Sequence, residues 1–311
     1  MSEIIKDLKS EDFANLFNVD IGDLNPNCKS LIDQLDFKYK LLDQNDRDRL
    51  ILSILELLES PEPPPIGNQR SDWESRWSVI LQNFIQSGYN ISQLIPDFLR
   101  RKRPIRIGLN YGLPINYDFE LNLHRVIHRW IFLRYLSDAE VIYEFGCGTA
   151  FNLVELAQLY PEKELHGLDW VNPTKMIIDL LAEKYGYNIT GHVFDMASPD
   201  MNLTVKSGST ISTFGGLEQL GNNFEPFLKF VLSKSPSLCV NLEPLDELYD
   251  PANSLIDYMA HRFNHKRNYL TGYLARLRQL EKEGRVRIIK VHKMSYGLYL
   301  ESYSLVVWKP I

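Results

Sequence analysis

The chain has 311 residues, of which 44% are hydrophobic and 24% charged, values that exclude a disordered, collagen-like or coiled-coil protein. Lys and Arg number 34 against 40 Asp and Glu, and the net charge of −6 argues against a general polyanion binder. The sequence has no run of about 18 uncharged apolar residues, so it predicts no membrane span. Cys28, Cys147 and Cys239 are an odd number at no metal-ligand spacing, which predicts a reducing compartment, the cytoplasm.

Basic residues are concentrated in two segments. Residues 261–293 hold ten Lys or Arg against two acidic residues, a local charge of +8. Residues 100–106 hold five basic residues in seven. Such segments are usually solvated surface, and the alternative is a face that binds phosphate or carboxylate.

The first 135 residues are predicted to form a mainly helical region. Apolar side chains recur at helical spacing in three stretches, residues 50–58, 72–87 and 119–136. The prolines between Pro61 and Pro65 cannot continue a helix and predict an extended linker. Residues 96–116 are rich in Pro, Gly and Asn and are predicted to be a loop.

Residues 136–311 are predicted to form an α/β domain. Short apolar runs alternate with amphipathic helices, and these runs are residues 141–143, 165–168, 189–194, 210–214 and 238–242. This alternation implies crossover connections and a mostly parallel sheet. Two last strands, 286–291 and 303–308, have a short connection that favours an antiparallel hairpin at the sheet edge. The expected fold is a Rossmann-like, seven-stranded, mostly parallel sheet with a C-terminal antiparallel hairpin.

A glycine-rich turn follows the first strand of this domain. Gly146 and Gly148 permit a tight turn and close approach of the backbone to a ligand. The dinucleotide-binding pattern Gly-x-Gly-x-x-Gly would need a small residue at Phe151, whose ring is too bulky. The small residue stands one position earlier, at Ala150. A dinucleotide site is therefore disfavoured.

With Glu144 before it, the turn resembles the first motif of class I S-adenosylmethionine-dependent methyltransferases. That motif is Glu/Asp-x-Gly-x-Gly-x-Gly, and Ala150 is the departure from it. The cofactor has a cationic amino group and a sulfonium. The resemblance implies that Glu144 and the backbone of Gly146, Cys147 and Gly148 hold its methionine part.

The ends of the next strands carry the other residues that the resemblance implies for this cofactor. Asp169 would bind both ribose hydroxyls, because one carboxylate can accept two hydrogen bonds. Trp170 would pack on the adenine. Asp195 would bind the adenine amino group, with the backbone amide of Met196 beside it. Phe214, at the end of the fourth strand, completes the predicted cofactor set.

The segment Leu217-Glu218-Gln219-Leu220 comes shortly after the fourth strand. It looks like the Leu-Glu-His-Leu segment of methyltransferases that act on small molecules, with Gln219 in the place of the histidine. Methyl transfer is an in-line displacement that needs an aligned acceptor and, for a hydroxyl, a group to take its proton. Acceptor-binding groups are therefore expected after the fourth and fifth strands.

The predicted catalytic residues follow the fifth strand. Glu243 and Tyr249 belong to a segment dense in acids and prolines. His261 and His265 lie on a predicted helix and share one face with Asp257. An aspartate that orients a histidine base is a recurring arrangement in enzymes.

The spacing of His261 and His265 also fits a pair of metal ligands. Two histidines four residues apart bind zinc in the pattern His-Glu-x-x-His. That pattern needs a glutamate where this chain has Arg262. The sequence therefore predicts no metal site.

The resemblance covers residues 139 to 311, so the helical region is additional to the minimal methyltransferase fold. Such additions usually cover the cofactor and shape the acceptor site. Arg106, Tyr111, Asn116 and Tyr117, in the predicted loop, are therefore expected to be lid residues.

Three functions are weighed. The first is a methyltransferase that acts on an oxygen or nitrogen of a small molecule, such as a sugar, a polysaccharide precursor or a secondary metabolite, with an anionic acceptor open. The second is an RNA or protein methyltransferase that uses residues 261–293, although the overall acidity disfavours nucleic acid. The third is a non-catalytic binding protein, against which Glu144, Asp169 and Asp195 all count. A homo-oligomer is compatible with each.

Overall fold

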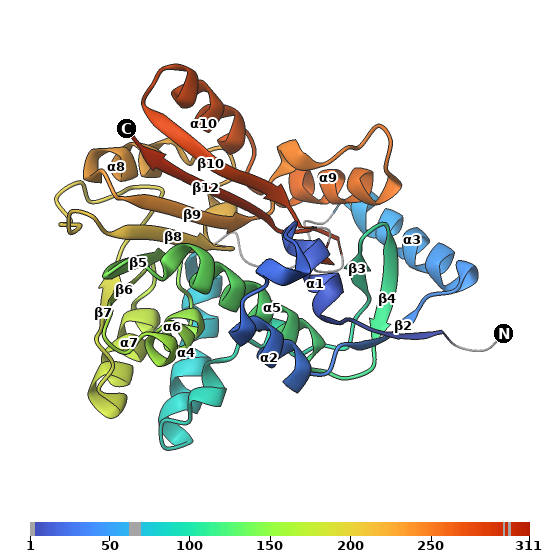
Figure 1. The fold of residues 1–311 in the computed structure, drawn as a ribbon, viewed down its shortest axis with the longest axis horizontal. Helices are drawn as coiled ribbons and strands as arrows, with labels where there is room; N and C mark the ends of the chain where they lie inside the picture. Colours follow the sequence, from blue (N-terminus) through green and yellow to red (C-terminus); the bar gives the residue numbers. More distant parts are fainter. Residues whose placement is uncertain (1–3, 62–69, 295, 298–299) are drawn as a thin grey trace.

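The computed structural model describes residues 4–61, 70–294, 296–297 and 300–311 (Figure 1). Most of the linker predicted between Pro61 and Pro65 lies outside the described residues. Within them, seven strands form the central sheet of the C-terminal region. These strands are β5 (Val141–Phe145), β6 (Glu164–Asp169), β7 (Ile189–Val193), β8 (Thr210–Phe214), β9 (Leu238–Glu243), β10 (Val286–Lys293) and β12 (Ser304–Pro310). Each lies within two residues of its predicted bounds.

The strand order of this sheet is β10-β12-β9-β8-β5-β6-β7. The strands from β9 to β7 run parallel, and β12 runs antiparallel to both β9 and β10. The last strand of the chain is therefore inserted between β9 and β10. The predicted mostly parallel sheet with a C-terminal antiparallel hairpin is confirmed.

Helices cover both faces of this sheet, so its strands are buried on both sides. Two separate hydrophobic cores result, and successive residues of β12 show the division. Leu305 and Val307 belong to one core, and Val306 and Trp308 belong to the other. The helices of the C-terminal region are α6 (Phe151–Leu159), α7 (Asn172–Tyr185), α8 (Glu225–Lys234), α9 (Leu255–Arg267) and α10 (Tyr273–Lys282).

The N-terminal region has helices over the three predicted stretches, residues 50–58, 72–87 and 119–136, and further helices that were not predicted individually. They are α1 (Ser10–Phe17), α2 (Pro26–Gln34), α3 (Gln44–Glu59), α4 (Arg70–Gln86) and α5 (Phe119–Ile131), with a π-helical turn η4 (Phe132–Leu136) and short 3₁₀ turns η1 (Ile21–Asp23), η2 (Ile91–Leu94) and η3 (Asp97–Leu99). The helix α5 packs into the same core as α6 and α7, and α4 contacts α7. The N-terminal region therefore packs directly against the seven-stranded sheet and its helices.

A second sheet, which the sequence analysis did not predict, accompanies these helices. Its strand order in the described residues is β1-β2-β4-β3-β11. The strands are β1 (Ile5–Asp7), β2 (Lys38–Leu41), β3 (Ile105–Ile107), β4 (Asn110–Pro114) and β11 (Tyr296–Gly297). The prediction of a loop over residues 96–116 was wrong, because β3 and β4 form a hairpin there. These strands are too short to carry a clear alternation of apolar and polar residues.

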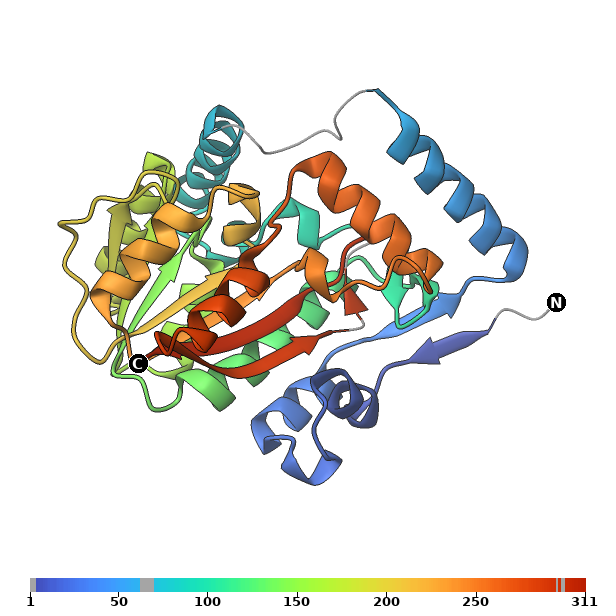
Figure 2. The same cartoon turned by 90° about the horizontal axis from the view of Figure 1, so that it is seen from above.

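The two regions of the chain are also joined near α9. Figure 2 shows α3 beside α9, and the two helices are in contact. The guanidinium of Arg106, on β3, is paired with the carboxylate of Asp257 on α9, and Lys293 on β10 binds the same carboxylate at 2.7 Å. None of the helices in the described ranges combines the length and the apolar character needed to cross a bilayer.

Candidate functional site

A cavity of about 490 Å³ lies at the carboxyl ends of the parallel strands, a volume in the range of small-molecule sites. One wall comes from the loops that follow β5, β6, β7 and β8. The other wall comes from the N-terminal region, from α9 and the residues that follow it, and from the segment before β12. Open α/β sheets bind ligands at this edge.

The loop after β5 is a tight, left-handed turn. Gly146 has φ +71° and its amide donates to the carbonyl of Leu168 at 2.7 Å. A Cβ on Gly146 would stand 2.8 Å from the Cα of Gly216, so glycine is required there. Ala150 has φ 62°, which explains why a glycine is usual at this position of the motif. The alanine therefore holds a strained conformation that costs about 1 kcal/mol.

The carboxylate of Asp169 faces this turn from the end of β6. Its Oδ2 accepts the amide of Gly148 at 2.9 Å, and its Oδ1 accepts that of Val171 at 3.3 Å. Burial raises the pKa of Asp169 to about 7. The side chain lines the cavity beside Trp170. Asp169 thus joins two neighbouring strand ends and also reaches the ligand space.

The loops after β7 and β8 extend the same wall. Asp195 lines the cavity, and its Oδ1 accepts the amide of Ala197 at 2.8 Å. The cavity brings together most of the predicted cofactor residues, namely Gly146, Cys147, Gly148, Asp169, Trp170, Asp195, Met196 and Phe214. Their convergence is a geometric fact, and their role with a cofactor remains a prediction.

Glu144 is the exception, since it lies behind the turn and not on the cavity wall. Its side chain is fully buried, and Oε1 accepts a hydrogen bond from the side-chain amide of Asn152 at 2.7 Å. Asn152 in turn bonds to Nδ1 of His128 at 2.9 Å. The other oxygen, Oε2, is buried without a partner in the described residues. Burial raises the pKa of Glu144 from 4.5 to about 8, so the carboxyl is mainly protonated at neutral pH.

Replacing Glu144 by glutamine is expected to change how stability depends on pH. Because the folded pKa is raised to about 8, the folded state keeps a proton that the unfolded state releases above its ordinary pKa of 4.5. The carboxyl therefore lowers the free energy of unfolding as pH rises, by at most about 1.4 kcal/mol per pH unit. This loss ends above the folded pKa. The free energy of unfolding is measured with urea for both proteins. The value for the glutamine variant minus that for the wild type should be larger at pH 8 than at pH 5.5. A pH-independent difference would contradict the protonated state of Glu144.

The predicted catalytic histidines lie outside the cavity lining. His261 and His265 both contact Asp246, at 2.9 Å and 3.1 Å. Asp257, which the sequence analysis placed on their face, turns inward to Arg106 and Lys293. The prediction of an Asp257–histidine pair was wrong, because the buried Arg106 and the partly buried Lys293 bind that carboxylate.

Glu243 and Tyr249 are also absent from the cavity lining. Glu243 is fully buried, and its two carboxylate oxygens accept the amides of Leu217 and Glu218 at 3.1 and 3.0 Å. The hydroxyl of Tyr249 donates to the carbonyl of Ser302 at 3.2 Å, and burial raises its pKa. Both residues hold the loops that form the cavity wall.

Glu218 is a cavity residue that the sequence analysis did not select as catalytic. It lies in η5 (Leu217–Leu220), shortly after β8. Its carboxylate accepts a hydrogen bond from the side-chain amide of Gln219 at 2.9 Å. Burial, followed by the charges of Glu243 and Glu301, raises the pKa of Glu218 well above its ordinary value. The resemblance of this segment to Leu-Glu-His-Leu was the signal that could have identified it.

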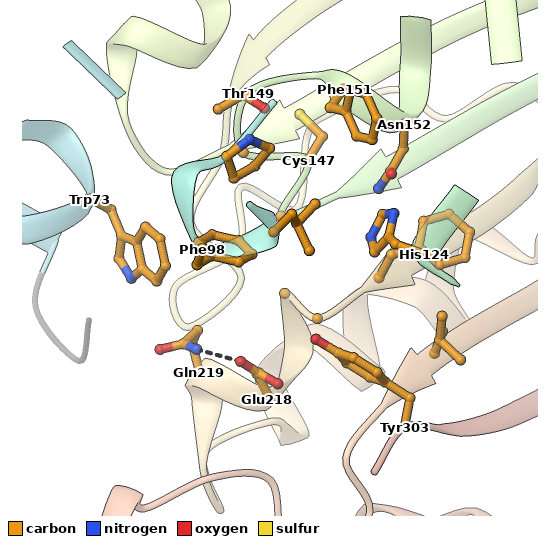
Figure 3. A pocket seen from close by; sticks show the side chains of 18 of the residues that line it. Trp73, Phe98, His124, Cys147, Thr149, Phe151, Asn152, Glu218, Gln219 and Tyr303 are labelled. Atoms are coloured by element: carbon orange, nitrogen blue, oxygen red, sulfur yellow. Dashed lines mark hydrogen bonds between the residues drawn. The ribbon is translucent and has the colours of Figure 1, made fainter. Parts of the chain in front are cut away.

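Glu218 faces the cavity from the side opposite the glycine turn. Figure 3 shows Glu218, Gln219 and Tyr303 on one side and Cys147 and Thr149 on the other. The charged and aromatic residues that share the lining with Glu218 come from distant segments and are Arg103, Glu120, Phe263, Arg267, Tyr269, Glu301 and Tyr303. The cavity therefore has space beyond the predicted cofactor residues.

The cover over this space comes from elements other than the predicted lid. Besides Arg103 and Glu120, the N-terminal lining residues are Leu57, Trp73, Arg76, Trp77, Pro96, Phe98, Leu99, Leu123, His124, Ile127 and His128. Arg106, Tyr111, Asn116 and Tyr117 are not among the lining residues. Tyr111 is packed in the core, whereas Tyr117 is 66% exposed. The expectation that these are lid residues was wrong: Arg106 and Tyr111 lie on β3 and β4 of the second sheet, and Asn116 and Tyr117 follow β4 outside the cavity lining.

No protein-family model matches the chain, and no curated protein matches it. Among solved structures, geranyl diphosphate C-methyltransferase from Streptomyces coelicolor A3(2), with Mg²⁺, geranyl diphosphate and S-adenosylhomocysteine, is 11% identical over 75% of this chain and 98% of that chain, with a TM-score of 0.45. An rRNA methylase from Escherichia coli is 12% identical over 85% and 90% of the two chains, with a TM-score of 0.45. The [4+2]-cyclase SpnF is 9% identical over 79% and 97%, with a TM-score of 0.48. These three similar proteins differ in activity.

Proposed function

We propose that this chain is a class I S-adenosylmethionine-dependent methyltransferase that acts on an oxygen or nitrogen of a small molecule. The observation that carries the proposal is the convergence of the glycine turn, Asp169 and Asp195 on one cavity. Each belongs to the carboxyl end of a different parallel strand, in the order that the sequence motif implies. The remaining cavity space provides room for an acceptor.

The residues of the first wall have distinct tasks in this proposal. The cofactor supplies an activated methyl group on a sulfonium. Asp169 binds the ribose hydroxyls, and Asp195 with Met196 binds the adenine, beside Trp170. Burial raises the pKa of Asp169, and the positive charge of a bound cofactor would lower it again and so favour the carboxylate. Glu144 keeps the glycine turn in place through Asn152 and contacts no ligand.

Glu218 is proposed as the group that takes the proton of a hydroxyl acceptor. The cofactor, held by Asp169 and Asp195, would supply the methyl group to the acceptor oxygen and would keep the electron pair of the broken carbon–sulfur bond on its sulfur. The hydroxyl proton passes to the carboxylate of Glu218. Glu243 positions this group, because it accepts the amides of both Leu217 and Glu218. Four residues that were predicted to be catalytic lie outside the cavity lining, and the proposal gives them no contact with the reacting atoms. They are His261, His265, Glu243 and Tyr249.

The acceptor is proposed to be a small molecule with an apolar or ring-shaped body. Aromatic rings from Trp73, Phe98 and Phe263 line the cavity. Arg103, which could have bound an anion, already makes two hydrogen bonds to Glu120, at 2.8 and 3.1 Å. This pairing makes Arg103 a poor anion-binding residue and favours a neutral acceptor next to it.

The basic segment 261–293 offers limited support for an RNA or protein substrate. Lys293 binds Asp257, and Arg276 makes two hydrogen bonds to Glu225, each of 3.2 Å. Arg267 is 6% exposed. These cations stabilise the fold, so the proposal favours a small acceptor.

The cytoplasm is proposed as the compartment. Cys28, Cys147 and Cys239 are all free and buried. A reducing environment would keep them so.

The function is tested by incubating the protein with S-adenosylmethionine and panels of nucleotide sugars, phenols and amines. Formation of S-adenosylhomocysteine that depends on one acceptor class is expected, together with a mass increase of one methyl group on that acceptor. Stimulation by RNA alone, with a steep dependence on salt, would favour the second function instead.

A further inference from the structure

Three metal-ligating side chains converge outside the cavity. The Nδ1 of His261 lies 2.9 and 3.0 Å from the two oxygens of Asp246, and the Nε2 of His265 lies 3.1 Å from Oδ2. One ligand atom of each residue lies within 4.8 Å of the others. Asp246 belongs to η6 (Asp246–Leu248), which follows β9, and both histidines belong to α9.

The helix and the turn explain this convergence. His261 and His265 are one turn apart on α9, so their rings lie side by side, with centroids 4.3 Å apart. In the pattern His-Glu-x-x-His a glutamate follows the first histidine, and on α9 that position is Arg262. The structure supplies the carboxylate from the turn after β9 instead, which no helical pattern reveals.

A second cluster of histidine and carboxylate side chains does not bring its three ligand atoms to one point. The Nε2 of His166 contacts Glu164 at 2.8 Å, and its Nδ1 contacts the Nε2 of His192 at 3.1 Å. The two partners are on different nitrogens of one ring, so they cannot share an ion with a single atom of His166. Among the described residues, the Asp246 cluster is the one in which three such atoms converge.

We propose that Asp246, His261 and His265 bind one divalent transition-metal ion, of which Zn²⁺ is the type. Two imidazoles and one carboxylate suit Zn²⁺, Co²⁺ or Ni²⁺ and do not suit Mg²⁺ or Ca²⁺, which prefer oxygen ligands. The Asp246–histidine atom pairs, 2.9 to 3.1 Å apart, are close enough for each histidine and the aspartate to reach one ion at metal–ligand distances of about 2.1 Å. Water completes the coordination, because the side chain of His265 is 54% exposed.

The ion would join His261 and His265 on α9 to Asp246 in the turn after β9. Phe263 and Arg267, on the same helix, line the cavity. The metal therefore takes no part in methyl transfer and acts on the position of the acceptor wall. The three ligands lie outside the cavity lining, so the test of metal binding does not depend on the proposed activity.

The test uses untagged full-length protein that has been treated with a chelator and then freed of it. Titration with Co²⁺ is expected to give one equivalent of binding with visible absorption bands, and Zn²⁺ should displace it. Because changes to residues around metal ligands already cost about 10- to 100-fold in affinity, His265→Ala and Asp246→Asn should weaken binding at least about tenfold. His192→Ala, from the non-convergent cluster, is the matched control and should bind as the wild type does.

Thermal unfolding provides a second readout. Co²⁺ should raise the melting temperature of the wild type and of His192→Ala but not that of His265→Ala. Since His265 is half exposed, its replacement leaves the fold intact. Failure of the wild type to bind Co²⁺ at about 0.1 mM, or equal affinity in His265→Ala, would overturn the proposal. Both results would leave the two imidazoles as simple hydrogen-bond donors to Asp246.

Discussion

Replacing Asp169 by alanine is expected to weaken the binding of S-adenosylhomocysteine at least about 100-fold. In the proposed site this carboxylate accepts two hydrogen bonds from the ribose, and hydrogen bonds to a charged group are worth about 1.5–3 kcal/mol each. A loss of about 3 kcal/mol corresponds to about 100-fold in affinity. Asp169→Asn retains one acceptor oxygen and should lose only about tenfold. Isothermal titration calorimetry measures all three affinities.

The matched control is Asp200→Ala. Asp200 accepts the amide of Asn202 at 2.9 Å, much as Asp169 accepts that of Val171, but it is exposed and outside the cavity lining. Its replacement should leave the affinity unchanged. Melting temperatures of the variants separate loss of binding from damage to the turn. An affinity of Asp169→Ala equal to that of the wild type would refute the ribose assignment.

Replacing Glu218 by glutamine is expected to lower the turnover number by about 100- to 10,000-fold, the usual contribution of general base catalysis. The affinity for the cofactor should stay within about twofold, since the residue lies across the cavity from the glycine turn. The pKa of Glu218 is raised well above its ordinary value, and only the carboxylate can take a proton. The wild-type rate should therefore rise with pH through that pKa, and the variant should lose this rise. Initial rates of S-adenosylhomocysteine formation, with the acceptor found by screening, test this.

Glu247→Gln is the control for Glu218. Its carboxylate accepts the amide of Leu274 at 3.0 Å and is not part of the cavity lining. Turnover and the pH profile of this variant should match the wild type. If Glu218→Gln kept the wild-type turnover and pH profile, Glu218 would be a structural residue of the loop, and Glu301→Gln would be the next variant to measure.

The central sheet could be predicted from the sequence because its signals are local. Each parallel strand is a short apolar run between helices, and burial on both faces makes those runs continuous. The second sheet could not be predicted in this way. β11 has two residues and pairs with β3, which lies in the other region of the chain. Such pairing is set by tertiary contacts, which leave little pattern in a strand of that length.

The candidate site divides in the same manner. The wall that holds the predicted cofactor residues could be predicted because each residue ends or closely follows a parallel strand, and all such ends meet at one edge. The opposite wall combines residues such as Phe98, Glu120 and Tyr303, whose positions in the sequence share no motif. The pairing of His261 and His265 with Asp246 was missed for the same reason. A helix face predicts which residues share a side, but not what that side packs against.

The most direct measurement is a crystal structure of the protein with S-adenosylhomocysteine. The ligand is expected in the cavity, with its ribose on Asp169, its adenine beside Asp195, and its sulfur towards the space in front of Glu218. A ligand bound elsewhere would contradict the proposed methyl transfer. So would a cavity that stays without ligand at millimolar concentrations of the compound.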